Sequence, residues 1–530
     1  MTPSVRYVAF VLASLPTVAY AGGFEIPDNG TQALGRGTAF VAKADDGTAL
    51  QYNPAGFARQ RGTRVLANGN VYFQSYSFRR IGTFPDDPND PATPWGGKPY
   101  PEVENSAGPY TIPFIALSTD FGSLDRFTLA AGVFMPSIIG NRTFPLGVRG
   151  APASSRYDFI QHRDSYLFPS LAAAYRITPW LDFGVAGHLV LAKIDQTIVT
   201  YADTGQCKNQ EYQPCDSRGT LTANGTTAAA TIGLLLRPDP SWAVGLSVRT
   251  PVSVNASGQL KTEAARVGDL QGGTGDASVS TKLPLVTRLG ARYIQMDREF
   301  EVWDLELDAV YEGWGGAQGD GVRVTVPKLG DYRNIDALFR HGYKSTFSIR
   351  GGGAHNFEAG GGLLTVRLGG FYETPATDFA TTRLDHDTLS KIAGTIGLGY
   401  KIAQFGFDVG YAAVASVPRT VGVNQGEVRP INIGKGGNTV DANDQALGPV
   451  NEGAYRGFTH IVSVGITITF DTFFGEPRKV HYGNPYEPGY EPEGTPAKKE
   501  KEKEREDSGW EEKKPPKKKP KKPEPEPDDE

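Results

Sequence analysis

Hydrophobic and polar residues alternate in stretches between Thr63 and Phe470, most clearly in the last stretch, His460–Phe470. There Val462, Val464, Ile466, Ile468 and Phe470 fall on one face, and Ser463, Gly465, Thr467 and Thr469 fall on the other. A period of two places the two sets on opposite sides of a β-sheet. The pattern predicts an all-β protein, although a soluble sandwich and a membrane barrel both alternate in this way.

Fourteen such stretches, each about 10 to 16 residues long, can be placed along the chain. They begin near Arg64, Tyr110, Arg126, Ser165, Leu181, Thr226, Ser241, Ala277, Glu301, Ser345, Leu363, Leu389, Gln404 and Tyr455. An even number is typical of a bacterial outer-membrane barrel, whose first and last strands begin and end on the same side.

The connections between these stretches alternate in length. The short ones are 121–125, 177–180, 238–240, 295–300 and the step near Ala403, and the long ones are 81–109, 137–164, 193–225, 315–344 and 416–454. Outer-membrane barrels have short periplasmic turns and long extracellular loops. A sandwich has no reason to alternate, so this asymmetry favours a 14-stranded antiparallel transmembrane barrel over residues 63–470.

The composition excludes two further classes of protein. Of the 530 residues, 65 are Gly, 11% are aromatic and only 3 are Met. No stretch supplies the run of about 20 apolar residues that a spanning helix needs, which excludes a helical membrane bundle. The net charge of -5 lacks the basic excess of a nucleic-acid-binding protein, so we expect no nucleic-acid partner.

The first 21 residues have the features of a cleaved signal peptide. Arg6 supplies the positive charge, Val8–Leu15 the apolar region, and Ala19-Tyr20-Ala21 a cleavage site, so the mature chain is expected to begin near Gly22. An N-terminal anchor helix is the alternative, but its apolar run is short and Pro16 interrupts it. Export to the outer membrane is therefore expected.

The barrel is flanked by two segments of different character. Residues 22–62 lack a sustained strand pattern but contain buriable side chains such as Leu34, Phe40 and Phe57, which favours a hatch inside the barrel. Residues 471–530 form a charged tail: from Ala497 to Glu530, twelve Lys or Arg and twelve Asp or Glu accompany six prolines. Such a composition predicts a disordered periplasmic spacer, with a cell-wall or periplasmic partner as the alternative.

Enzymatic chemistry finds little support. The seven histidines are scattered without metal-ligand spacing, and the chain lacks a Gly-x-Ser-x-Gly elbow and a phosphate-binding loop, so we expect no cofactor and no metal. An outer-membrane lipase would require a Ser and a His side by side, which sequence alone does not test. Cys207 and Cys215 lie in a polar segment, where an oxidising compartment would let them form a disulfide.

The alternation also predicts which cationic residues face the lumen, where one of them could bind a carboxylate. Each lies on the face of its strand opposite to the apolar residues: Arg249, Arg288, Arg292, Arg350 and Arg367. The alternative is that these arginines pair with lumen acids such as Asp304, Glu306 and Asp308.

Pro136 follows the third predicted strand. Because proline cannot donate to a sheet ladder, it would leave a local gap in the barrel wall, unless it merely ends the strand.

Three groups of residues resemble the FadL-type outer-membrane long-chain fatty-acid transporters, which include the TodX-type transporters of aromatic hydrocarbons. The first group is Gly35-Arg36-Gly37-Thr38-Ala39, Ala44-Asp45-Asp46 and Asn53-Pro54-Ala55-Gly56. The second runs from Leu283-Pro284 through Arg288-Leu289-Gly290 to Trp303–Tyr311 and Trp314. The third comprises Arg350-Gly351-Gly352-Gly353, Leu364–Gly370 and Pro375. The resemblance covers roughly residues 22–470.

The resemblance implies a 14-stranded barrel closed by an N-terminal hatch that contains Asn53, Pro54 and Ala55, which together with Phe24 are the candidate ligand-binding residues. A hydrophobic ligand, expected to be a long-chain fatty acid, would bind near the mature N-terminus at Phe24. It would leave sideways into outer-membrane lipid through a gap in the third strand, at Pro136. The charged tail departs from the family pattern, in which chains commonly end at the terminal aromatic residue. A general polar porin is the main alternative function, and a lipase is a lesser one.

Overall fold

The computed structural model describes residues 29–470, except for 123, 137–140, 204, 264, 267–271, 299, 318–320, 330–331, 434–439 and 442–443. The predicted signal peptide, Phe24 and the charged tail lie outside the described residues. Within the described part of the chain, no helix has the length and apolar character needed to cross a membrane.

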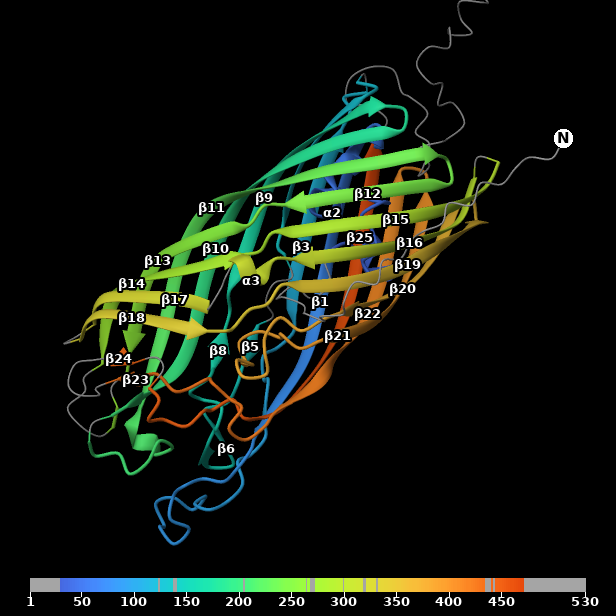
Figure 1. The fold of residues 1–530 in the computed structure, drawn as a ribbon. Helices are drawn as coiled ribbons and strands as arrows, with labels where there is room; N and C mark the ends of the chain where they lie inside the picture. The colour runs from blue at the N-terminus through green and yellow to red at the C-terminus, as the bar shows by residue number, and fades with distance from the viewer. Residues whose placement is uncertain are drawn as a thin grey trace, which may run out of the picture. The chain divides into compact units, whose positions relative to one another are not determined.

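Fourteen strands of the described chain close into an antiparallel barrel (Figure 1). The barrel closes where β1 pairs with β25 over its whole length, from Thr63 opposite Phe470 to Arg80 opposite Gly453. In order around the wall, the strands are β1 (Thr63–Arg80), β3 (Tyr110–Thr119), β4 (Phe127–Phe134), β9 (Ser165–Thr178), β10 (Leu181–Ala202), β11 (Asp216–Asp239), β12 (Trp242–Arg249), β15 (Val286–Asp297), β16 (Phe300–Glu312), β19 (Thr346–Ala359), β20 (Gly362–Glu373), β21 (Lys391–Ile402), β22 (Phe405–Val421) and β25 (Gly453–Phe470).

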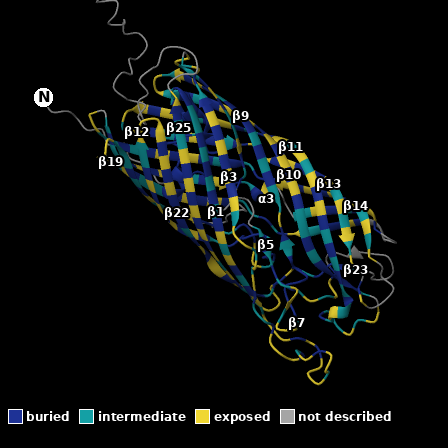
Figure 2. Ribbon diagram, turned by 180° about the vertical axis from the view of Figure 1, so that it is seen from behind, coloured by how far each residue is buried: buried dark blue, intermediate teal, exposed yellow. Residues whose placement is uncertain are grey.

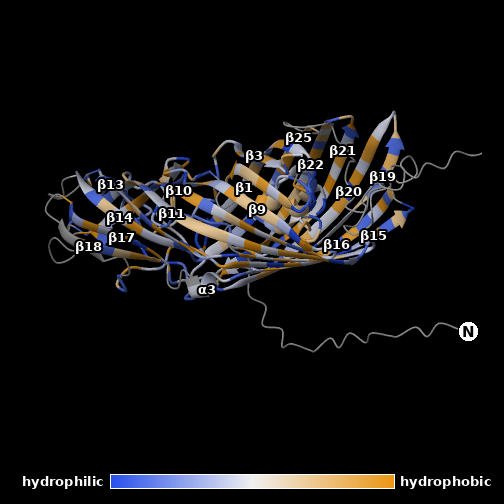
Figure 3. Ribbon diagram, turned by 90° about the horizontal axis from the view of Figure 1, so that it is seen from above, coloured by the Kyte–Doolittle hydropathy of each residue, from blue (hydrophilic) through white to orange (hydrophobic). Residues whose placement is uncertain are grey.

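The barrel exposes apolar side chains and buries polar ones. On β16, Leu307 is 61% exposed while the next residue, Asp308, is 1% exposed. The same inversion runs along β25, where Val464 is exposed and Ser463 is buried. Figure 2 shows buried and exposed positions alternating along the strands, and Figure 3 shows apolar positions recurring around the wall. An apolar outer surface around a polar interior is the arrangement of a transmembrane barrel and the reverse of a soluble sandwich.

The two ends of the barrel differ as the sequence predicts. Short turns join β3 to β4, β9 to β10, β11 to β12, β15 to β16, β19 to β20 and β21 to β22. The other end has long connections with short elements: β2 (Val103–Glu104), β5 (Arg142–Thr143), β6 (Gly147–Val148), β7 (Ala151–Pro152), β8 (Gln161–His162), η2 (Gln213–Cys215), β23 (Asn432–Ile433) and β24 (Val440–Asp441). We therefore assign the short turns to the periplasm and the long connections to the exterior.

Beyond the barrel, part of the wall continues as an outer sheet of β13 (Val252–Thr262), β14 (Gly273–Leu283), β17 (Gly321–Leu329) and β18 (Tyr332–Arg340). Pro251 separates β12 from β13, and Pro284 separates β14 from β15, because proline cannot donate to a ladder. α3 (Trp314–Ala317) follows β16.

Two of the predicted long connections, 193–225 and 315–344, are wrong in part, because strands occupy much of each. Residues 193–225 are mostly strand rather than loop, and β11 begins ten residues before Thr226. The outer hairpin β17–β18 likewise occupies much of the predicted loop 315–344. The start of β11 is rich in polar and small residues, which obscured its alternation. β17 does alternate, with Val322, Val324 and Val326, but the prediction assigned it to a loop.

Candidate functional site

The N-terminal segment, residues 29–62, lies buried among the strands. It comprises α1 (Thr31–Gly35), α2 (Ala49–Tyr52) and the 3-10 helix η1 (Pro54–Arg59), and nearly all its described residues are buried. α1 contacts β20, β21, β22 and β25, while η1 contacts β4, β9, β10 and β11. Because these strands lie on different sides of the closed barrel, the segment reaches across its interior.

Glycines on ten strands let this segment pack directly against the wall. A Cβ atom added to any of them would lie 3.1 Å or less from an atom of the N-terminal segment. We call this set the glycine belt: Gly132, Gly184, Gly233, Gly245, Gly290, Gly352, Gly369, Gly397, Gly410 and Gly465. Several are direct partners across strands, such as Gly184 with Gly233 and Gly397 with Gly410. A larger residue at any of these positions would displace the segment or the strand. The glycines therefore leave the room that the segment occupies inside the barrel.

β16 contributes no glycine to the belt. Its acidic side chains bind the N-terminal segment instead. The Arg36 guanidinium donates two hydrogen bonds of 2.7 Å to the two oxygens of Asp304, and both side chains are fully buried. Arg292 also bonds Asp304, at 2.6 Å. Glu306 accepts from the backbone N–H of Ala42 at 2.6 Å. The ionic contacts fix the segment at its middle.

Breaking this buried contact should cost far more than breaking an exposed one. Arg36→Ala leaves Asp304 with one of its two guanidinium partners and should lower the free energy of unfolding by about 3–5 kcal/mol. The exposed pair Arg323–Asp336 provides the control, because Arg323→Ala should cost less than about 1 kcal/mol. Urea titration of folded barrels followed by tryptophan fluorescence measures both variants. Equal losses would show that Arg36 does not anchor the segment.

The five predicted lumen arginines are all buried, but they have different surroundings. Arg292 pairs with Asp304 and Glu301, and Arg367 donates to Asp408 at 2.7 Å, as the ion-pair alternative expects. Arg350 donates to Thr38 of the N-terminal segment at 3.0 Å. Arg288 lies with its guanidinium carbon 6.0 Å from the ring centroid of Tyr52.

Arg249 is 2% exposed and occupies a different part of the lumen from the ion pairs around Asp304. Its partner across the β11–β12 ladder is Thr231. It therefore belongs with the polar groups of β9, β10 and β11 described below.

Asn53, Pro54 and Ala55 lie against the wall at β10 and β11. The Asn53 amide donates to the carbonyl oxygens of Val41 and Leu234, both at 3.0 Å, and its oxygen accepts from Ala55 N–H at 3.1 Å. These contacts hold the N-terminal segment against the wall, and they engage both the nitrogen and the oxygen of the Asn53 amide. The three residues thus pack the segment against the wall, and the ligand contact expected from the sequence remains a prediction.

A cavity of about 240 Å³ lies in the wall where β4 ends. β4 pairs with β3 only up to Phe134 opposite Phe114, so the first residues of β3 continue beyond its end. The cavity is lined by Ile112, Pro136 and Tyr166 and also by the charged residues Arg163 and Asp164. Asn29, the first described residue, donates to the carbonyl oxygen of Met135 at 2.6 Å. The start of the described chain thus lies beside this cavity, and Pro136 borders it.

Inside the wall at this point is an aromatic cluster of Phe114, Phe134 and Phe168. Phe134 stands 5.6 Å from Phe114 and 5.2 Å from Phe168, measured between ring centroids. The His188 ring lies edge-on to Phe134 at 5.7 Å. The three rings are fully buried in the largest apolar cluster of the barrel, next to the cavity rather than in its lining.

A polar row follows the aromatic cluster across four strands: Ser170, His188, Thr231 and Arg249. The Ser170 hydroxyl lies 2.7 Å from His188 Nδ1, and the Thr231 hydroxyl lies 2.8 Å from His188 Nε2. The sequence could not exclude such a Ser–His contact. However, a serine hydrolase triad has a carboxylate on the second histidine nitrogen, and here a hydroxyl occupies that place. The Ser170–His188 pair therefore lacks the carboxylate that orients the histidine of a triad and stabilises its protonated form.

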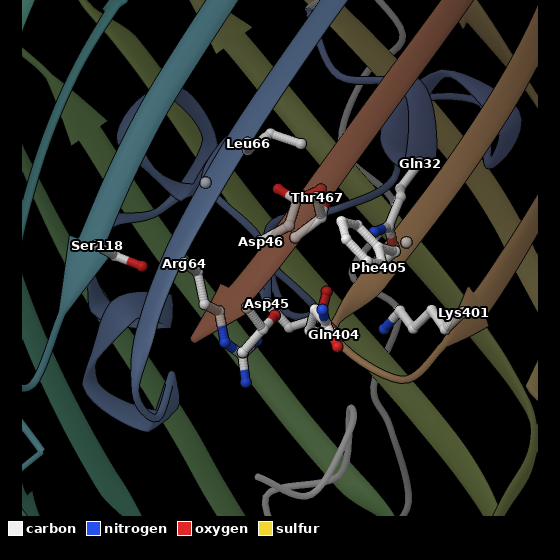
Figure 4. A pocket seen from close by; sticks show the side chains of 13 residues that line it. Gln32, Asp45, Asp46, Arg64, Leu66, Ser118, Lys401, Gln404, Phe405 and Thr467 are labelled. Atoms are coloured by element: carbon white, nitrogen blue, oxygen red, sulfur yellow. The ribbon is translucent and has the colours of Figure 1, made fainter. Parts of the chain in front are cut away.

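A second cavity, of about 40 Å³, lies at the periplasmic side of the N-terminal segment (Figure 4). Asp45, Arg64 and Lys401 line it. Burial raises the pKa of the neighbouring Asp46 to about 6, although hydrogen bonds from Thr48 oppose the rise. A single water needs roughly 10–15 Å³ of such space, so this charged cavity has room for only a few water molecules and is too small for a hydrophobic ligand.

Cys207 and Cys215 form a disulfide in the connection between β10 and β11.

Comparison with known proteins assigns the chain. A family model described as "Outer membrane protein transport protein (OMPP1/FadL/TodX)" matches residues 12–456. The chain belongs to the FadL/TodX family. It is therefore an outer-membrane β-barrel of a family of transporters of hydrophobic compounds, as the sequence resemblance predicted. No curated protein sequence matches it.

Solved structures of this family share the fold at low identity. The FadL homologue of Pseudomonas aeruginosa has a TM-score of 0.66 at 14% identity, covering 85% of this chain and 100% of its own. The toluene transporter TodX of Pseudomonas putida has 0.60 at 16% identity, covering 84% and 99%. The toluene transporter TbuX of Ralstonia pickettii has 0.59 at 15% identity, covering 84% and 100%.

Three features of the site were missed from the sequence. The glycine belt was visible only as a high glycine content, since facing glycines come from strands far apart in the chain. Arg36 was noted within a family motif but not as the ionic anchor. The aromatic cluster consists of inward-facing rings, whereas the sequence predicted inward positions only for arginines and acidic residues.

Proposed function

We propose that the chain mediates passive uptake of long-chain fatty acids through a barrel plugged by the N-terminal segment, with a lateral exit beside Pro136. The observation that carries the proposal is the aromatic cluster with its adjoining polar row, next to the cavity at the end of β4. The cluster offers apolar contact worth about 0.8 kcal/mol per buried methylene. Arg249, in the polar row, supplies a positive charge for a carboxylate.

The positions of the two cavities support a lateral route. The larger one lies in the wall, where β4 ends and Pro136 has no N–H to offer a neighbouring strand. The smaller one lies below the N-terminal segment and is lined by charges. Both cavities have charged residues in their lining, but only the larger one lies in the wall, where a departing fatty acid would enter lipid tails that match its own chain.

The choice of a fatty acid over an aromatic hydrocarbon depends on Arg249. An ionised carboxylate gains a charge-assisted hydrogen bond from a guanidinium, and toluene does not. Wild-type protein in detergent should bind oleate more tightly than oleyl alcohol, which has the same tail. A hydrogen bond to a charged group contributes about 1.5–3 kcal/mol, so Arg249→Gln should weaken oleate binding about ten-fold or more. Isothermal titration of both ligands measures this.

The affinity for oleyl alcohol is the control, because it should change little in Arg249→Gln. Arg367→Gln is a matched variant, since Arg367 already pairs with Asp408 and should leave the preference for oleate unchanged. Equal affinity of the wild type for oleate and oleyl alcohol would contradict fatty-acid specificity. Tighter binding of toluene than of either would favour an aromatic substrate.

A general porin is the alternative, and planar-bilayer conductance separates the two. A plugged transporter should conduct ions poorly, whereas an open aqueous channel gives large, steady currents.

A further inference from the structure

Three metal-binding side chains meet in the extracellular connections, although they are distant in the sequence. His341 follows β18, and Asp385 and His386 lie in the connection between β20 and β21. Their donor atoms all lie within 4.8 Å of one another. His341 and His386 are buried, and the Asp385 side chain is only 15% exposed. Spacing along the chain gave no sign of this group, because the fold brings the two connections together.

The hydrogen bonds of His341 leave a site for a cation. Its Nδ1 lies 2.8 Å from the carbonyl oxygen of Phe339, which can only accept, so Nδ1 carries a proton. In the neutral ring, Nε2 then presents a lone pair, and it lies 2.5 Å from the Asp385 carboxylate, which is also an acceptor. Two facing acceptors need a proton or a metal ion between them. A metal-bound histidine commonly has its second nitrogen on a backbone carbonyl, as His341 does.

The surrounding side chains hold the other two ligands in place. The His162 ring packs on His386 at 4.8 Å between centroids, and its Nδ1 lies 3.1 Å from the backbone oxygen of Asp385. Arg383 pairs with Asp158 at 3.0 Å. His386 Nε2 lies 4.0 Å from Asp385 Oδ2. Ligands at about 2.0–2.1 Å from a tetrahedral Zn²⁺ are about 3.3 Å apart, so small side-chain shifts would complete the site.

We propose that His341, Asp385 and His386 bind a divalent transition-metal ion, with Zn²⁺ the best match, and that water completes the coordination. Two imidazoles and one carboxylate form a ligand set that Zn²⁺ accepts. The ion ties the residues after β18 to the β20–β21 connection. That connection also places Leu384 and Leu389 in an apolar cluster with Tyr76 and Tyr455 at the outer end of the barrel. Metal binding thus fastens the extracellular cover of the lumen.

The test uses the full chain without a histidine tag, folded in detergent, stripped with EDTA and titrated with ZnCl2 by calorimetry. We expect one Zn²⁺ per barrel. Loss of an outer hydrogen-bond partner alone costs about 10–100-fold in metal affinity, so His341→Ala and His386→Ala should each weaken binding at least about 100-fold. His355→Ala is the control, because His355 is exposed on β19, in another part of the fold.

Folding of each variant is checked by its heat-dependent mobility on gels, and His386→Gln provides a milder change if His386→Ala fails to fold. Co²⁺ titration adds an independent readout, since bound Co²⁺ should give a visible spectrum that both histidine variants lose. Absence of saturable Zn²⁺ binding to the wild type would overturn the proposal. So would wild-type affinity in folded His341→Ala and His386→Gln.

Discussion

Deletion of residues 22–62 is expected to convert a poorly conducting barrel into an open pore. The N-terminal segment reaches across the interior and fills the space between the glycine belt and the acids of β16. A barrel of 14 strands without internal contents leaves a water-filled lumen, so ion conductance in planar bilayers should rise by more than about ten-fold. The barrel itself should persist, because its ladder closes through β1 and β25 without the segment.

A pair of glycine variants on one strand refines this test. Gly184 faces the segment, and a Cβ there would lie 2.3 Å from the backbone of Pro54, whereas a Cβ on Gly187 would meet nothing within 4 Å. Gly184→Val should displace the segment and raise conductance, and Gly187→Val should not. Unchanged conductance in both the deletion and Gly184→Val would mean that the segment does not plug the lumen.

Replacing Pro136 with valine is expected to reduce uptake of a hydrophobic ligand into whole cells. Valine restores a backbone donor at the end of β4, and lipid-exposed backbone groups strongly favour partners. The restored pairing should narrow the cavity between β3 and β9, and uptake should fall at least about three-fold if this cavity is the exit. Affinity in detergent should hardly change, because Arg249 and the aromatic cluster remain in place.

Pro418→Val is the matched control, because Pro418 is an exposed proline on β22, which pairs with β21 and β25 and not with the strands around the cavity. It should leave uptake unchanged. The amount of folded barrel must be equal in all variants. Loss of both affinity and uptake in Pro136→Val would indicate misfolding, and unchanged uptake would show that Pro136 merely ends a strand.

The barrel could be predicted from the sequence because its determinants are local. Alternation within a stretch such as His460–Phe470 identifies a strand with one apolar face, and the alternating lengths of connections identify the two ends. Strand ends were less predictable: β11 begins at Asp216, among Ser, Thr and Gly residues that follow no apolar pattern. There the long-range pairing with β10 and β13 determines the strand.

The arginines illustrate the limit of the same reasoning. The alternation of period two placed Arg292 and Arg367 on the inward face, but it did not show which acid each of them pairs with. That pairing depends on which acids come close in the folded barrel, such as Asp304 for Arg292 and Asp408 for Arg367.

The sequence by itself determined the class of fold, the membrane environment and the family, because each depends on short-range periodicity or on contiguous motifs. Only the tertiary structure decided how the lumen is filled and which groups meet. Gly184 contacts Pro54, Arg36 contacts Asp304, and His341 contacts Asp385 across separations that carry no periodic signal. Such contacts arise when a closed barrel brings distant strands and loops around one interior, and their chemistry therefore becomes visible only after the chain has folded.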